Sequence, residues 1–167
     1  MSSFDPAELD RLREIAALRL GEDVQDEQLE LIVKRAAEEL GLPIAAVSIV
    51  LDEAQYMVAT HGLDSSWIGS ARGTPKEWSF CRHAVDRRAP FIVEDAAEVS
   101  EVAENPLVHN DSVRTYLGVP LITSRDQAIG ALCVIGSERR TFSTQAVGHP
   151  VSLADELLPL LEARRAD

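Results

Sequence analysis

The runs TYLGVPLIT (residues 115–123) and AIGALCVIG (residues 128–136) decide the fold of this chain. Both are rich in β-branched and other apolar residues, and only the polar segment SRDQ separates them. Two such runs joined by a short polar connection predict an antiparallel hairpin. Because neither run alternates with polar residues, we expect both faces of this hairpin to be covered by other parts of the chain.

Three more strands are predicted on the N-terminal side of this hairpin. Residues 44–51 (IAAVSIVL) and 56–62 (YMVATHG) predict a second hairpin across the turn DEAQ. Residues 90–95 (PFIVED) predict another short strand, followed by a loop with one helical turn.

Helical patterns lie at both ends of the chain. Asp5 and Pro6 are typical of a helix start, and an apolar stripe (Leu9, Leu12, Ile15, Ala16, Leu20) follows at helical spacing. A second helix is predicted over residues 26–40, and Ser79 is suited to begin a short helix over residues 80–86.

The last helical region runs from about residue 143 to residue 165 and contains Gly148, Pro150 and Pro159. Proline inside a helix removes a hydrogen bond and clashes one turn back. We therefore expect a break near residues 148–150 and a kink near Pro159.

The order helix, helix, hairpin, short helix, strand, loop, hairpin, helix predicts an α+β fold in which helices pack on an antiparallel sheet. We expect the 167 residues to form a single domain (1–167). Terminal helices over about 5–20 and 151–165 would flank its core.

The composition narrows the function classes. A net charge of −12 disfavours binding to nucleic acid or to an anionic membrane. Two cysteines make no disulfide scaffold, no secretion signal is present, and no apolar run is long enough to span a membrane. We therefore expect a cytoplasmic protein with neither nucleic acid nor membrane as a partner.

Six short motifs follow one another in a characteristic order. They are WSFCRHAV, PFIVEDA, ENPLV, RTYLGVPLIT, AIGALCVIG and RRTFS. Together they resemble the GAF domains of bacterial signalling proteins, over about residues 26–147. The resemblance implies a six-stranded antiparallel sheet with a helical layer behind it and a ligand-pocket layer in front, as in GAF and PAS folds. It also implies a small-molecule sensor or a dimerisation module, without identifying a ligand or cofactor.

The resemblance places the pocket walls at residues 67–85 and 93–114. Basic and aromatic side chains that would contact a ligand gather there: Trp67, Arg72, Trp78, Phe80, Cys81, Arg82, Arg114 and Tyr116. Alternation along the strand puts Arg114 on the face of Tyr116, where Arg114 would bind either an anionic ligand or the carboxylate of Glu94 or Asp95.

Cys81 and His83 raise the question of a reactive thiol. Residues two apart on a helix point to different faces, so His83 would not serve as the base for Cys81. We interpret Cys81 as a small apolar residue of the pocket wall. Cys133 should be core, on one sheet face with Ile129, Ala131 and Ile135.

The sequence gives less support to sulfoxide reduction, bilin attachment or metal binding. The free methionine sulfoxide reductases among GAF proteins carry cysteines in their pocket-wall loops, and residues 92–116 contain none. Bilin attachment lacks its cysteine in the same region. His61, His83, His109 and His149 show no metal-ligand spacing.

We therefore expect a stand-alone, non-catalytic GAF domain that forms a homodimer through its terminal helices. It would sense a small-molecule ligand or dock on a signalling protein. Two alternatives remain: a thiol-redox enzyme using Cys81, of the free methionine sulfoxide reductase type, and a structural interaction module with no ligand.

Overall fold

A computed structural model describes residues 5–20, 27–62, 73–75, 79–110 and 113–165. The helices are α1 (Pro6–Leu18), α2 (Glu27–Leu40), α4 (Cys81–Arg87), α5 (Pro106–Asn110) and α6 (Thr144–Glu162), with a 3-10 turn at Ala96–Glu98. The strands are β1 (Ile44–Val50), β2 (Ala54–His61), β3 (Gly73–Pro75), β4 (Phe91–Val93), β5 (Thr115–Ile122) and β6 (Ala128–Gly136).

The strands form one antiparallel sheet in the order β3-β2-β1-β6-β5-β4. Both predicted hairpins are present, and β1 pairs with β6, so that the two hairpins meet at the centre of the sheet. The α+β class with an antiparallel sheet and packed helices is confirmed. The three-residue edge strand β3 was not predicted as a strand.

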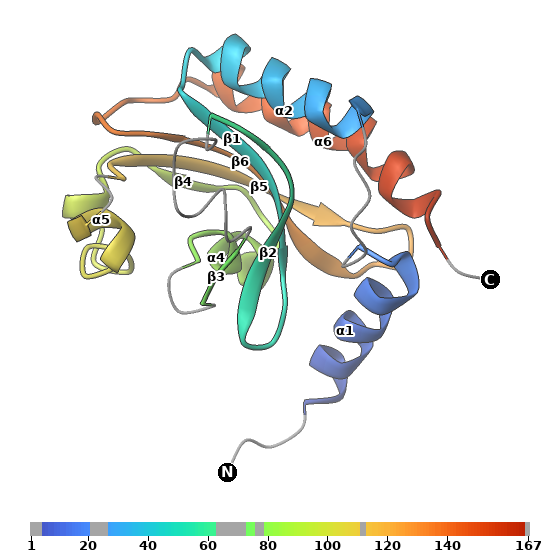
Figure 1. Cartoon of the computed structure of the whole chain (residues 1–167). Coiled ribbons are helices and arrows are strands. Elements are labelled where there is room, and N and C mark those ends of the chain that lie inside the picture. Colours follow the sequence, from blue (N-terminus) through green and yellow to red (C-terminus); the bar gives the residue numbers. More distant parts are fainter. Residues whose placement is uncertain (1–4, 21–26, 63–72, 76–78, 111–112, 166–167) are drawn as a thin grey trace.

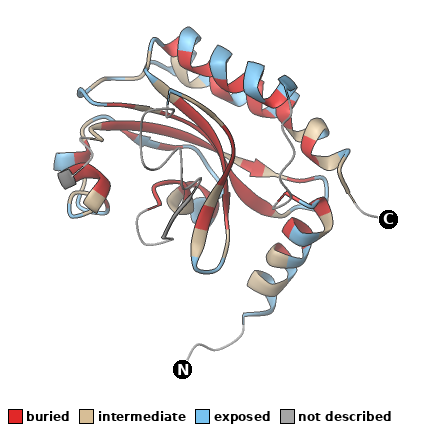
Figure 2. Cartoon of the chain, viewed as in Figure 1, coloured by how far each residue is buried: buried red, intermediate tan, exposed pale blue. Residues whose placement is uncertain are grey.

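Helices cover the two faces of the sheet unequally (Figure 1). The long helices α2 and α6 lie side by side on one face, whereas α4 packs on the other face against β6 and β5. The central strands are buried between these layers (Figure 2), as their apolar sequences predicted.

Two apolar clusters result. The helix-side core contains residues of α2, α6 and the sheet, among them Leu29, Val33, Leu117, Leu132 and Leu157. The front core lies on the opposite face, beneath α4. It consists of Ala46, Val50, Met57, Phe80, Cys81, Ala84, Val85, Phe91, Val93, Ala96, Val102, Leu107, Val108, Tyr116, Ala128, Ala131 and Cys133.

A bulge in β6 places Ile129 on the sheet face opposite to the predicted one. Leu121 pairs with Gly130 and Ile122 pairs with Ala128, so Ile129 has no partner in this register. The extra residue turns Ile129 to the helix-side core, while Ala131 and Cys133 belong to the front core. Strict alternation had placed Ile129 with Cys133, which is wrong.

Helix α1 begins as predicted, because the Asp5 side chain accepts a hydrogen bond from the Ala7 amide at 3.0 Å. Its buried side is different from the predicted apolar stripe: Arg11 and Glu14 are buried, and Ala16 is exposed. The reason is tertiary, since both charged groups find partners on the sheet or at the C-terminal end of α6.

Helix α6 is continuous across Gly148 and Pro150, so the predicted break there is wrong. Ser143 caps its first turn by accepting from the Ala146 amide at 3.0 Å. Buried Pro150, Leu153 and Leu157 pack against the rest of the domain, and this packing offsets the missing proline hydrogen bond. The kink near Pro159 stays a prediction.

Candidate functional site

The predicted pocket residues divide into three groups. Trp67, Arg72 and Trp78 lie outside the described residues. Phe80, Cys81 and Tyr116 meet in the front core, and Arg82 and Arg114 are half-buried at its border.

Aromatic rings occupy the space in front of the sheet. The Tyr116 ring centroid lies 5.2 Å from that of Phe80 and 5.8 Å from that of Phe91. All three side chains are buried, with exposed fractions of 4% or less. In the described part of the chain, the predicted pocket layer is therefore packed as a second core around Tyr116.

Tyr116 is held in a specific position by the absence of a side chain at Gly118. A Cβ atom at Gly118 would lie 1.9 Å from the Tyr116 hydroxyl oxygen. The hydroxyl end of the tyrosine ring therefore occupies the place of a Gly118 side chain, and its hydroxyl donates a hydrogen bond to the Cys81 sulfur at 3.1 Å. The sequence correctly paired Gly118 with Tyr116 on one face, where the glycine leaves space.

Cys133 lies in the same place, which sequence reasoning missed. Cys133 pairs with Gly118 across β5 and β6, so its side chain adjoins the Tyr116 hydroxyl. Both cysteines are free and buried, and both adjoin the Tyr116 hydroxyl. Cys133 belongs to the core as predicted, but it also lies close enough to Cys81 for each thiol to shift the pKa of the other.

The two thiols differ in their tendency to ionise. The neighbouring Cys133 and the hydrogen bond from Tyr116 lower the pKa of Cys81 in spite of its burial. The neighbouring Cys81, together with burial, raises the pKa of Cys133 well above its usual range. Burial also raises the pKa of Tyr116, which stays a neutral donor at physiological pH. Cys81 is therefore the more easily ionised thiol of the pair.

A buried polar group adjoins the thiols. Ser48 and Ser79 both donate hydrogen bonds to the Gln55 side-chain oxygen, at 2.8 and 2.7 Å. Ser79 also accepts from the Arg82 amide at 3.2 Å, which supports its predicted role at the start of α4. Sequence reasoning missed Ser48 and Gln55; a serine inside the otherwise apolar run 44–51 was the available signal.

His83 lies away from Cys81, as predicted. Its ring packs on Phe91 at 4.9 Å between centroids, and its Nδ1 atom lies 3.7 Å from a Glu101 carboxylate oxygen. Burial is the main reason that the pKa of His83 is lowered. Within the described residues no cluster of three or more His, Cys, Asp or Glu side chains is arranged to hold a metal ion.

Arg114 does not form the ion pair that the sequence suggested. In the described segments, neither the Glu94 nor the Asp95 carboxylate lies within ion-pair distance of Arg114. The Asp95 side chain instead accepts from the Ala97 amide at 3.1 Å, and Glu94 accepts from the Phe142 amide at 3.3 Å. Asp95 caps the 3-10 turn that follows it, and Glu94 bonds to the segment before α6, so the ion-pair prediction is wrong.

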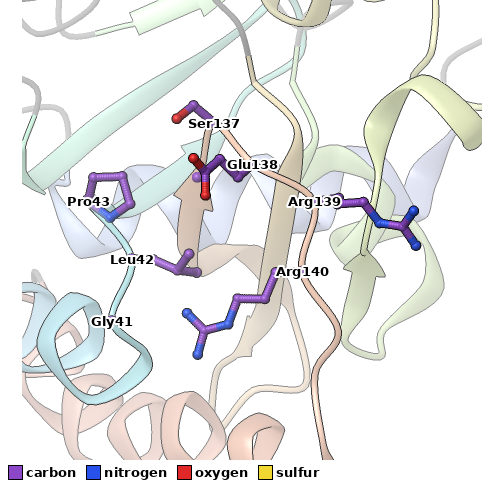
Figure 3. Close-up of a pocket in the computed structure, with 8 residues that line it drawn as sticks. Gly41, Leu42, Pro43, Ser137, Glu138, Arg139 and Arg140 are labelled. Atoms are coloured by element: carbon purple, nitrogen blue, oxygen red, sulfur yellow. The ribbon is translucent and has the colours of Figure 1, made fainter.

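A separate groove lies between the end of α2 and the segment after β6 (Figure 3). Its volume is about 220 Å³, and its lining is Gly41, Leu42, Pro43, Gly136, Ser137, Glu138, Arg139 and Arg140. Arg140 points toward Gly41 at the end of α2, whereas Arg139 points away. The groove is smaller than typical small-molecule sites and contains none of the predicted site residues.

An antiparallel sheet with long helices behind it and a short helix in front defines a small α+β domain. Residues 25–157 match the GAF domain family, and the chain belongs to that family.

Two relatives illustrate the range of this family. The chain is 36% identical over 124 residues to the cyclic di-GMP phosphodiesterase PA2567 of Pseudomonas aeruginosa, covering 74% of this chain and 20% of that protein. The GAF domain of a phosphoenolpyruvate-protein phosphotransferase from Coxiella burnetii aligns with a TM-score of 0.67 and 23% identity, over 96% of this chain and 97% of that one.

The same fold occurs in an enzyme. The free methionine-R-sulfoxide reductase of Neisseria meningitidis aligns with a TM-score of 0.65 and 17% identity, over 98% of this chain and 95% of that one. At this identity the likeness concerns the fold alone. Among the described helices, none combines the length and apolar character needed to cross a bilayer.

Proposed function

We propose that this GAF domain is a non-catalytic regulatory module of signal transduction that acts through protein contacts, beginning with its own dimerisation. The similarity to part of a cyclic di-GMP phosphodiesterase supports a role beside a signalling enzyme. The front core supports the proposal, because among the described residues Phe80, Phe91 and Tyr116 pack together on the face where a ligand pocket was expected.

The ends of the domain are linked in a way that suits such a module. Buried Glu14 in α1 forms an ion pair with Arg165, just after α6, and accepts a hydrogen bond from Thr123 at 2.6 Å. Glu162 of α6 accepts from the Ser124 hydroxyl, also at 2.6 Å. Both terminal helices thus attach to the β5–β6 turn, so a partner that moves one helix would disturb the other.

Native mass spectrometry of gently purified protein, compared with its denatured mass, tests this proposal. We expect a denatured mass equal to the 18.3 kDa chain and a native mass of twice that value, with no bound molecule. A monomer at every concentration up to the millimolar range would overturn dimerisation. A mass excess under native conditions alone would favour a ligand sensor instead.

A small-molecule sensor is the second candidate, and Arg82 is the observation that favours it. The Arg82 Nε atom is buried and has no hydrogen-bond acceptor among the described residues. A buried guanidinium nitrogen without an acceptor is costly, and an anionic ligand would supply one. The sensor predicts that anionic nucleotides raise the melting temperature of the wild type and of Arg88→Gln, but not of Arg82→Gln.

Thiol-based enzymatic turnover is the third candidate. A base for Cys81 is absent from its described neighbours, because His83 contacts Phe91 and Glu101. Assay of methionine sulfoxide reduction would decide it: turnover that is lost in Cys81→Ala would contradict the non-catalytic proposal.

A further inference from the structure

The two cysteines of the chain come together from distant parts of the sequence. Cys81 begins α4, and Cys133 lies on the central strand β6, on which α4 packs. One hydroxyl adjoins both: Tyr116 donates to the Cys81 sulfur at 3.1 Å and lies over Gly118, the strand partner of Cys133. The two thiols lie close enough for each to shift the pKa of the other.

We propose that Cys81 and Cys133 are a peroxide-oxidisable dithiol, in which Cys81 reacts with hydrogen peroxide and Cys133 then closes a reversible disulfide between α4 and β6. Disulfide formation needs two cysteines close together on packed elements, and this pair adjoins one hydroxyl, that of Tyr116, where α4 packs on β6.

The reaction balances with hydrogen peroxide as the oxidant. The Cys81 thiolate sulfur attacks one peroxide oxygen, the O–O bond breaks, and the departing hydroxide takes up a proton to leave as water. The sulfur of Cys133 then attacks the Cys81 sulfenic acid, the S–O bond breaks, and the leaving hydroxide takes the Cys133 proton as a second water. Two thiols supply the two electrons that reduce one peroxide molecule.

The surroundings assign the two roles. Cys81 accepts a hydrogen bond from the Tyr116 hydroxyl at 3.1 Å, and this donor favours its thiolate, the form that attacks peroxide. The raised pKa of Cys133 keeps it protonated until its partner is oxidised. Cys133 is therefore the resolving thiol.

The burial of both cysteines restricts the oxidant to a small molecule. Each cysteine is only 3% exposed, so the sulfur of a protein disulfide cannot approach either thiol. Hydrogen peroxide is close to water in size and can reach such a site through local opening of the fold. This inference does not depend on which partner or ligand the domain has.

The test is peroxide treatment of the native full chain, followed by quenching, denaturation and alkylation. We expect alkylatable thiols to fall from two to zero, with a mass loss of two hydrogen atoms and a cross-linked peptide that joins Cys81 to Cys133. Dithiothreitol should restore both thiols. Two thiols that remain alkylatable, or independent conversion of each cysteine to sulfinic acid, would overturn the proposal.

Two variants, Cys133→Ala and Cys81→Ala, distinguish the peroxide-reactive thiol from the resolving thiol. Circular dichroism checks that each variant folds. In Cys133→Ala the Cys81 sulfenic acid has no resolving thiol, so dimedone should label Cys81 after peroxide treatment. In Cys81→Ala we expect Cys133 to stay fully alkylatable. Labelling of Cys133 in Cys81→Ala would contradict the assignment, and the wild-type cross-link is decisive even if a variant fails to fold.

Discussion

At the scale of single residues, Gly118 matters because Tyr116 occupies the place of its side chain. We expect Gly118→Ala to displace the tyrosine ring and to lower the free energy of unfolding by about 1–3 kcal/mol, as overpacking in cores does. Gly148→Ala is the matched control, because nothing lies within 4 Å of a Cβ there and its helix should gain about 0.5–1 kcal/mol. Chemical denaturation of both variants gives the comparison; equal effects would contradict the role of Gly118.

Glu14 makes a second prediction, concerning pH. The hydrogen bond from Arg165 is the main reason that the pKa of Glu14 is lowered from its ordinary value of 4.5. A lowered folded-state pKa means that the carboxylate stabilises the fold fully above that ordinary value and that this contribution is lost as the pH falls through the folded-state pKa.

We therefore expect Glu14→Gln to lower the free energy of unfolding by about 1–3 kcal/mol at neutral pH, with a smaller difference from wild type below about pH 4.5. Glu53→Gln, at an exposed turn residue, is the control and should change little. Urea titrations from pH 3 to pH 8 measure the effect, and a pH-independent difference would contradict it.

At the scale of elements, a single buried arginine joins α1 to the sheet. The Arg11 guanidinium donates to the Val50 carbonyl at 2.6 Å and to the Ala128 carbonyl at 3.4 Å, where β1 ends and β6 begins. It also forms an ion pair with Glu8 at 2.7 Å. The attachment of α1 therefore depends on polar contacts as well as on Ile15 and Leu18.

We expect Arg11→Met to keep the apolar stem but leave these carbonyls without a donor, at a cost of about 1–3 kcal/mol. Hydrogen–deuterium exchange of residues 6–18 should become faster in this variant. Arg13→Met, at an exposed position of the same helix, serves as the control. Unchanged exchange in Arg11→Met would mean that apolar packing alone holds α1.

At the scale of the whole molecule, the sheet carries an apolar core on each face. This arrangement predicts different responses from two neighbouring residues of β4: Phe91 is 2% exposed and Ile92 is 42% exposed. We expect Phe91→Ala to lower the free energy of unfolding by about 3–5 kcal/mol. Ile92→Ala should stay within about 0.5 kcal/mol of wild type. A small effect of Phe91→Ala would indicate an open pocket in front of the sheet.

Local sequence determined most of the helices and strands, and with them the α+β fold class. The apolar runs of β5 and β6 could form only a strand pair covered on both faces, and Asp5 and Gly41 marked helix ends that the structure contains. Motif order also indicated the GAF family. These properties follow from short-range patterns of size, polarity and backbone preference, so one sequence suffices to predict them.

Tertiary structure alone decided which side chains meet. Cys133 and Cys81 both adjoin Tyr116 because β6 lies at the centre of the sheet beneath α4, and Ile129 changes face because of a one-residue bulge. Pro150 remains inside α6, and Arg11 and Glu14 are buried in α1. Each outcome depends on partners far away in the chain, whose packing and hydrogen bonds outweigh local preference, and a local pattern contains no information about them.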